Sequence, residues 1–299
     1  EPLRTCPVHG VGLVTVSDEK RPARFHDFAQ LVQPALNELA RFSNQASRRS
    51  PSRLEGYLSD RMTGKEHPTL RLLGALPFYA AATTCEQLGA VAIHGIDVQV
   101  ETFNDDDWYQ AGAAGFEIAE AGEPGVRDLL VRIQANTIAK NGGDWGLRSL
   151  FGRLYKWLWE QLGDPAYVPV QEIFRQYVIE TFPFGPGDLI LGREVAARRL
   201  HSVRSASKEF GAHRKRLRKL LHAAGHISAE QLALTDDRIL FNADAAQNLL
   251  SLISEEMPLQ QVGQYLNIPR HIDRQLFTAG FIRPFIVGGL EKSIMHAFA

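Results

Sequence analysis

The chain is poor in cysteine: only Cys6 and Cys85 occur among its 299 residues. Two cysteines so far apart provide no framework of disulfides such as small secreted domains use. No secretory signal is visible at the start of the sequence,. Together these absences predict a protein of a reducing compartment, and we expect it in the cytoplasm.

Long apolar segments are also missing. The longest uncharged apolar run covers residues 72–85 and is interrupted by Gly74 and Pro77. A helix that crosses a bilayer needs about 20 apolar residues. The run is therefore predicted to lie in a core, and we expect no membrane partner.

A recognisable catalytic constellation is the third absence. The stretch NDDDW at residues 104–108 could offer carboxylates to the metal ion of a nuclease or transposase,. Adjacent carboxylates point in different directions on a helix or strand, so a helix cap is the favoured interpretation. The stretch NGGDWG at residues 141–146 lacks the Lys-Ser/Thr pair of a phosphate-binding loop,. The sequence predicts no enzyme, and a nuclease is the disfavoured alternative.

The sequence does have helical periodicity along most of its length. Apolar residues recur at helical spacing in residues 26–42, 53–62, 70–89, 105–122, 124–140, 148–163 and 168–182,. Ser52 and Thr69 are predicted N-caps, and Pro124 stands where helices start,. The aromatic residues of the last two segments could stack on bases, but at this spacing a core is the favoured interpretation.

Positive charge is concentrated in one short window. Residues 193–226 hold ten Lys or Arg residues and only two acidic ones, whereas the net charge of the whole chain is −1. A solvated surface mixes the two signs, so segregation on this scale predicts a polyanionic partner.

The basic window has the pattern of a helix-turn-helix. Val203, Ala206, Ser207 and Phe210 are predicted to face inward from a first helix, with Gly211 in the turn,. Ala212, Leu217 and Leu220 then seat a second helix. The residues predicted to contact double-stranded DNA are Arg204, His213, Arg214, Lys215, Arg218, Lys219 and His222,. A merely solvated amphipathic helix is the alternative.

A second, less basic copy is predicted further along the chain. Gly280 repeats the position of Gly225, and Asn267 stands where the turn glycine would be. Asparagine also tolerates the left-handed conformation. The cations of this copy are Arg270, His271, Arg274 and Arg283, and it could serve structure or protein binding instead of DNA.

Cys6 and His9 in CPVHG have the spacing of half a zinc site. A structural zinc ion takes four ligands, and Cys85 lies in an apolar segment where a buried structural thiol is favoured. His26 is a further candidate without a partner. The chain begins with Glu1, so we expect the other two ligands upstream of a truncated N-terminus.

The fold class we predict is mainly α. A helical domain is followed by tandem helix-turn-helix units, with the remnant of an N-terminal zinc-binding region. The predicted domains are residues 1–26 (end of the zinc-binding region), 27–187 (helical), 188–228 (basic helix-turn-helix) and 229–299 (degenerate second unit). The stretch PFGPGD at residues 183–188 marks the main boundary,.

These motifs together resemble the TniQ family of transposon target-selection proteins, which includes the TnsD-type selectors. The likeness rests on CPVHGVGL at the start, on residues 200–227, and on VGQYLNIPRHIDRQLFTAGFI near the end. It covers most of the chain and is strongest over residues 151–286. The upstream Cys-x-x-Cys-like pair of the family is absent here.

The resemblance implies a non-catalytic adaptor in which Cys6 and His9 are zinc ligands. Such proteins recognise a target by binding DNA or by docking onto an RNA-guided CRISPR effector complex, and they recruit an AAA+ transposition ATPase. A helix-turn-helix transcription regulator is the nearest alternative, because repressors use the same units. A homodimer is compatible with either.

Overall fold

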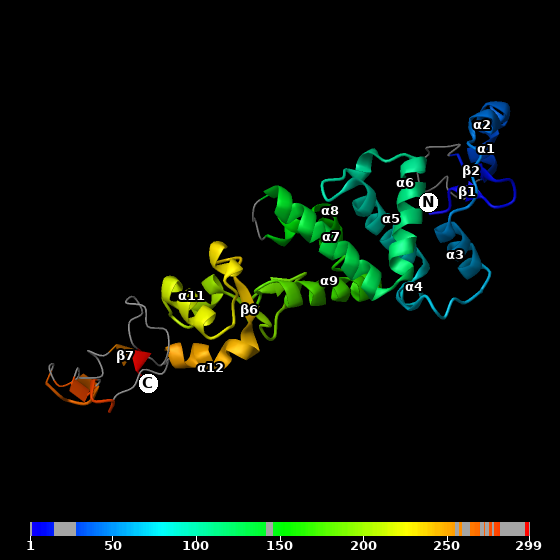
Figure 1. Ribbon diagram of the computed structural model, residues 1–299. Helices are drawn as coiled ribbons and strands as arrows, with labels where there is room; N and C mark the ends of the chain where they lie inside the picture. Colours follow the sequence, from blue (N-terminus) through cyan, green and yellow to red (C-terminus); the bar gives the residue numbers. More distant parts are fainter. Residues whose placement is uncertain are drawn as a thin grey trace. The chain divides into compact units, whose positions relative to one another are not determined.

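The structure is a computed structural model that describes residues 2–14, 28–141 and 146–254. Of the remaining C-terminal part it describes residues 257–258, 264–269, 272, 275–276, 278–281 and 297–298. The fold is mainly helical, which confirms the predicted class (Figure 1). The chain divides into two compact units, unit 1 at Glu1–Phe174 and unit 2 at Arg175–Ala299. Among the described residues, no helix combines the length and apolar character that crossing a membrane requires.

Unit 1 opens with a small antiparallel hairpin and continues with helices. Its strands are β1 (Thr5–Cys6) and β2 (Val11–Gly12). Its helices are α1 (Phe28–Leu36), α2 (Leu39–Gln45), α3 (Arg53–Met62), α4 (Arg71–Ala75), α5 (Phe78–His94), η2 (Val100–Thr102), α6 (Asp105–Glu120), α7 (Glu123–Asn141), α8 (Leu147–Glu160) and η3 (Pro165–Tyr167). Helix α9 (Val168–Thr181) crosses from unit 1 into unit 2.

Helices α3 and α6 of unit 1 are capped by side chains, as their residue types predict. The Ser52 hydroxyl accepts from the Glu55 backbone N–H at 3.2 Å, and the Glu55 carboxylate accepts from the Ser52 N–H at 2.7 Å. At α6 the Asn104 side-chain oxygen accepts from the N–H groups of Asp106 and Asp107. The helix-cap interpretation of NDDDW is therefore confirmed.

The predicted helix at residues 70–89 is instead two helices, α4 and α5. Pro77 lies between them as the N-cap of α5. A proline has no backbone N–H to donate within a helix, and its ring clashes with the preceding turn, so the first helix ends before it. The predicted N-cap Thr69 is wrong, because α4 is preceded by Leu70 without a side-chain cap.

Helices α5 and α6 pack with their backbones in direct contact. A Cβ atom on Gly115 would overlap the carbonyl oxygen of Cys85, and one on Gly89 would overlap that of Ala111. Cys85 itself is fully buried, and burial raises the pKa of its thiol. The structural interpretation of this cysteine therefore fits its surroundings, and the two glycines set the distance between the helices.

The aromatic residues of α8 and α9 lie in a core. Phe151, Leu154 and Phe174 are almost fully buried, and the rings of Phe151 and Phe174 meet edge to face at 5.0 Å. Gly152 has φ +47° and breaks the helical geometry of α8, where the loop carbonyl of Ile96 accepts a hydrogen bond from Arg153. These contacts support the core interpretation over a base-stacking platform.

Unit 2 combines helices with short strand pairs. The hairpin β3 (Leu189–Ile190) and β4 (Arg193–Glu194) comes first, followed by β5 (Leu200–Ser202), α10 (Val203–Glu209), α11 (Arg214–Ala223), η4 (Glu230–Ala233), β6 (Leu240–Asn242) and α12 (Ala243–Ser254). Strand β5 pairs antiparallel with β6. Near the end, β7 (Met257–Pro258) pairs antiparallel with β8 (Ala297–Phe298).

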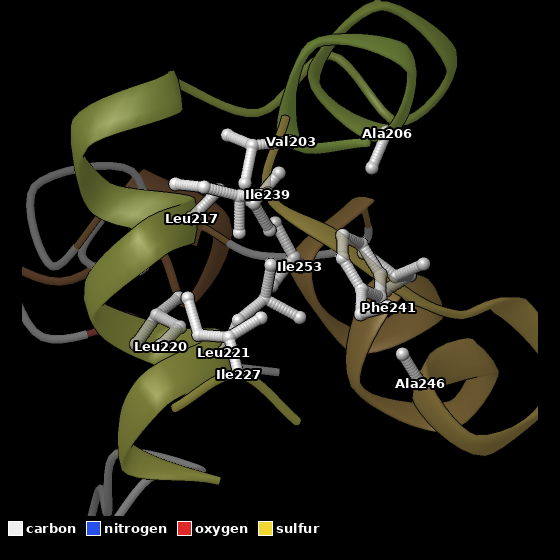
Figure 2. Packing of buried hydrophobic residues seen from close by; sticks show 11 residues of the cluster. Val203, Ala206, Leu217, Leu220, Leu221, Ile227, Ile239, Phe241, Ala246 and Ile253 are labelled. Carbon is white, nitrogen blue, oxygen red and sulfur yellow. The ribbon is translucent and has the colours of Figure 1, made fainter. Parts of the chain in front are cut away.

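One core joins α10, α11, β6 and α12. Its buried members are Val203, Ala206, Leu217, Leu220, Leu221, Ile227, Ile239, Phe241, Ala246, Leu250 and Ile253. Figure 2 shows the packing of this cluster. The predicted inward positions Val203, Ala206, Leu217 and Leu220 are thus confirmed. Ser207, Phe210 and Ala212 are partly buried.

The domain boundaries differ from the predicted ones. Residues 188–228 and 229–299 were predicted as separate units, yet the core above takes residues from both sides of position 228. The main division falls at Phe174 and Arg175, before the Pro/Gly stretch at residues 183–188. That stretch is held within unit 2, because the Gly185 N–H donates to Asp188 and the Arg198 guanidinium donates to the Pro183 carbonyl.

Candidate nucleic-acid interface

Helix α10 starts at a reciprocal cap. The Ser202 hydroxyl accepts from the Ser205 N–H at 3.0 Å, while the Ser205 hydroxyl accepts from the Ser202 N–H at 2.9 Å. Serine is a strong N-cap because its oxygen satisfies a backbone donor that the helix leaves unpaired. The cap fixes where α10 begins, so that Val203 and Ala206 face the core.

A tight turn connects α10 to α11. Gly211 has φ +68° there, and no atom lies within 4 Å of where its Cβ would be. The Ser207 hydroxyl donates to the Ala212 carbonyl at 2.6 Å across the turn. The turn therefore has the conformation predicted for its glycine, and the reason for glycine is backbone geometry alone.

Helix α11 separates apolar and cationic residues onto two sides. Leu217, Leu220 and Leu221 are buried, whereas Lys215, Lys219 and His222 are exposed. The last three are spaced four and three residues apart, so they share the face opposite the leucines. No acidic residue occurs in the helix.

The exposed cations extend to the N-terminal end of α11. Arg214 is exposed in the first turn, and His213 is exposed at the N-cap position, where its side chain makes no capping hydrogen bond. Together with Lys215, Lys219 and His222, they are five of the seven residues predicted to contact DNA. We call these five residues the α11 cationic face.

The other two predicted DNA contacts pair with aspartates of the same unit. Arg218 is partly buried and pairs with Asp236 at 3.3 Å, and it donates to the carbonyl of Leu234 at 3.1 Å. Arg204 is exposed and pairs with Asp237 at 3.4 Å. The sequence pattern counted both arginines among the residues predicted to contact DNA. It did not indicate their aspartate partners.

A buried histidine lies in the same unit and was not singled out from the sequence. His201 is 2% exposed, and its ring stacks on Phe241, which faces it across the β5–β6 pair. Burial lowers its pKa to about 4, and the nearby charge of Arg198 acts in the same direction. A histidine in a strongly basic window would be taken for an anion contact, whereas His201 is part of the core.

The electrostatic contrast between the units follows from the sequence. Unit 1 has 17 basic and 22 acidic residues, and unit 2 has 16 basic and 12 acidic residues. The cationic residues of unit 2 therefore give it a net positive charge within a nearly neutral chain. Such a charge raises the rate and strength of association with polyanions.

The predicted second copy is described only in part. Asn267 has φ +53° and Gly280 has φ +76°, matching the positive φ of Gly211 and Gly225. The Phe281 N–H donates to the Leu276 carbonyl at 2.9 Å, and the His226 N–H makes the equivalent bond to Leu221 at the end of α11. The cations predicted for this copy, Arg270, His271, Arg274 and Arg283, lie outside the described residues.

Cys6 and His9 come together at the tip of the β1–β2 hairpin. The Cys6 Sγ lies 3.3 Å from the His9 Nδ1, and Gly10 has φ +61° in the turn. A backbone hydrogen bond from His9 lowers the pKa of the Cys6 thiol, with its side-chain hydrogen bond as the next cause. The pair therefore has the donor chemistry that zinc uses.

Two donors are half of a structural zinc site. Within the described residues, no group of three or more His, Cys, Asp or Glu side chains could hold a metal ion. His26, the further candidate, lies outside the described residues. Cys6 and His9 alone do not fit a four-coordinate structural zinc.

The hairpin that carries this pair is anchored in unit 1. Arg4 is 7% exposed, and its guanidinium pairs with Glu86 at 2.6 Å, while its backbone N–H donates to Glu55 at 2.7 Å. Arg49 donates to the Arg4 carbonyl at 2.7 Å. The described part of predicted domain 1–26 is thus packed on the helices that follow it, and this link was not visible in the sequence.

The carboxylates of NDDDW serve in structure as well. Asp105 pairs with Arg4 at 3.7 Å, and Asp106 pairs with Arg49. Both aspartates therefore neutralise arginines that hold the N-terminal hairpin. Most of the glycine-rich stretch at residues 141–146 lies outside the described residues.

Comparison of the chain with protein-family models, curated proteins and solved structures finds no significant match.

Proposed function

We propose that the chain is a non-catalytic target-selection protein of bacterial transposition. It binds double-stranded DNA through a helix-turn-helix formed by α10 and α11, and it recruits an AAA+ ATPase that acts with the transposase. The family and the ATPase rest on the motif resemblance. The DNA-binding part rests on the geometry of unit 2.

The single observation that carries DNA binding is the α11 cationic face. It presents Lys215, Lys219 and His222 opposite the buried leucine face, and it presents His213 and Arg214 as exposed cations at the N-terminal end of the helix. A helix of ten residues with no acid is suited to a major groove lined by phosphates. In the proposed complex, α10 and the Gly211 turn hold α11 in place.

Two alternatives share this geometry. A docking adaptor would use the same cations on the RNA of a guide complex, and it would read no DNA sequence. A transcription regulator is favoured by a cavity of about 370 Å³ in unit 1, whose lining includes His94, Arg132 and Asn136. The regulator alternative requires that a small molecule bound in that cavity changes the affinity of the chain for DNA.

The test is fluorescence-anisotropy binding of the full chain to random-sequence duplex DNA across a salt series. We expect log affinity to fall linearly with log salt concentration, because bound phosphates release counterions. Reversing Arg214, Lys215 and Lys219 to Glu should abolish this binding. The matched control reverses Arg71, Arg148 and Lys156, which are exposed in unit 1.

An equal loss in both triple variants would mean that net charge alone matters, and the interface assignment would then fail. If the unaltered chain does not bind the duplex, the hypothesis of direct DNA recognition is wrong. A guide-RNA complex tested in the same titration would then decide for or against the docking adaptor.

A further inference from the structure

The loop between α11 and β6 lies against two arginines of the basic window. Arg218 donates to the carbonyl oxygens of Leu232 and Leu234, and it pairs with Asp236 at 3.3 Å. Both partners of this ion pair are about three-quarters buried. Arg218 is therefore held by three oxygen acceptors of one loop.

The next aspartate of the loop holds the second arginine. Asp237 pairs with the Arg204 guanidinium at 3.4 Å, and the side chains of Arg204 and Asp237 are 63% and 42% exposed. The backbone N–H of Arg204 also donates to the Asp236 carbonyl at 3.2 Å. Consecutive aspartates thus neutralise one cation from α10 and one from α11.

The loop is fixed to the core at its far end. Ile239 is fully buried, and its carbonyl accepts from the Val203 N–H at 3.1 Å. Its own N–H donates to the Thr235 carbonyl at 3.2 Å. Asp236 and Asp237 lie between these two anchors, so their positions beside the arginines are part of the fold.

We propose that Asp236 and Asp237 occupy the places of two DNA phosphates and so limit the charge that the interface offers. Carboxylates and phosphates both accept hydrogen bonds from the guanidinium fork. A phosphate that reaches Arg204 or Arg218 must therefore displace an internal acceptor. This inference rests on the proposed DNA binding.

The two ion pairs differ in how readily a phosphate can replace the aspartate. The Arg204–Asp237 pair is long and exposed, so water and salt screen it and little opposes its replacement. Arg218 keeps two carbonyl acceptors even without Asp236. A duplex would accordingly engage Arg204 first, and Arg218 only in a closely docked complex. The loop thus restrains weak, nonspecific binding.

The experiment compares the full unaltered chain with the double variant Asp236→Asn and Asp237→Asn in the duplex titration. Asparagine keeps the size of the side chain and removes the charge. We expect a several-fold gain in affinity at low salt. The slope of log affinity against log salt should steepen by up to about 1.8, because each additional phosphate contact adds about 0.9.

The matched control is the double variant Glu230→Gln and Asp244→Asn. It removes two negative charges from exposed positions of unit 2, whereas the ion pairs of Arg204 and Arg218 are with Asp237 and Asp236. An equal gain in both double variants would reduce the effect to net charge and overturn the inference. Unchanged or weakened binding by the Asp236 and Asp237 variant would also overturn it.

The single variant Asp237→Asn keeps the test valid if the double variant misfolds. Its ion pair lies at the surface and can be lost without exposing the core. This single variant should show about half of the slope change. If the unaltered chain binds and the aspartate variants do not differ from it, only the inference fails. If neither the unaltered chain nor any variant binds the duplex, the proposed function fails and the inference with it.

Discussion

The two units differ in how their helices pack and in where their charged side chains lie. Unit 1 brings α5 and α6 together at Gly89 and Gly115, and it neutralises buried charge in pairs such as Arg4–Glu86. Unit 2 uses one small core around the β5–β6 pair and leaves Lys215, Lys219 and His222 of α11 exposed. The comparison shows that an arginine is neutralised where folding brings a carboxylate from another part of the chain to it, as Glu86 reaches Arg4 and Asp236 reaches Arg218.

The four tryptophans make the two units distinguishable in one experiment. All of them lie in unit 1, at positions 108, 145, 157 and 159. Tryptophan fluorescence therefore reports the unfolding of unit 1, whereas far-ultraviolet circular dichroism reports the helices of both units. A substitution in either unit can be assigned by comparing the two signals.

The largest expected effect comes from Gly115→Leu. Its side chain would overlap the Cys85 carbonyl, and because backbone atoms cannot move aside cheaply, the cost should exceed the ~1–3 kcal/mol of ordinary overpacking,. Thermal melts should show the fluorescence transition lost or strongly lowered. Gly56→Ala is the control, because nothing lies within 4 Å of its Cβ position. A normal fluorescence melt for Gly115→Leu would refute the close packing of α5 on α6.

An intermediate effect is expected from acid in unit 2. The pKa of His201 is about 4 in the folded chain against 6.5 as its ordinary value. The unfolded chain binds the proton more tightly, so stability should fall as the pH drops from 6.5 toward 4. Denaturant melts followed by circular dichroism should show this loss, and His201→Gln should remove most of it. The same pH dependence in both proteins would assign the effect to other groups.

The smallest effect is expected from Gly211→Ala. The added methyl group meets no atom within 4 Å, so the cost is that of a left-handed conformation, roughly 1–2 kcal/mol,. The dichroism melt should shift slightly, and the tryptophan signal should not change. A larger loss, or a shift in fluorescence, would mean that the turn is not an independent feature of unit 2.

Local features were well predicted from the sequence because they depend on neighbouring residues. The Ser52 cap, the helix start beside Pro124 and the left-handed Gly211 each follow from a few side chains and the backbone. The mainly α class followed from periodicity in the same way. Where Pro77 interrupts an apolar run, periodicity alone joined two helices into one.

Contacts between residues that are distant along the chain were not predicted from the sequence. The domain boundary expected after residue 228 cuts a core, because Ile239 and Phe241 reach back to residues of α10 and α11. Arg218 belonged to a cationic pattern, yet its partner Asp236 is 18 positions away. Such pairings depend on which loop folds over which helix, and spacing along the chain does not encode that.

The sequence by itself determined the helical class, the concentration of positive charge in residues 193–226 and the two-sided character of α11. These properties are local, since they depend on residue type and on the 3.6-residue period of a helix. Only the tertiary structure decided which cations remain exposed and which are neutralised. The physical reason is that an ion pair needs two side chains within about 4 Å, and folding alone brings residues that are distant in sequence so close together.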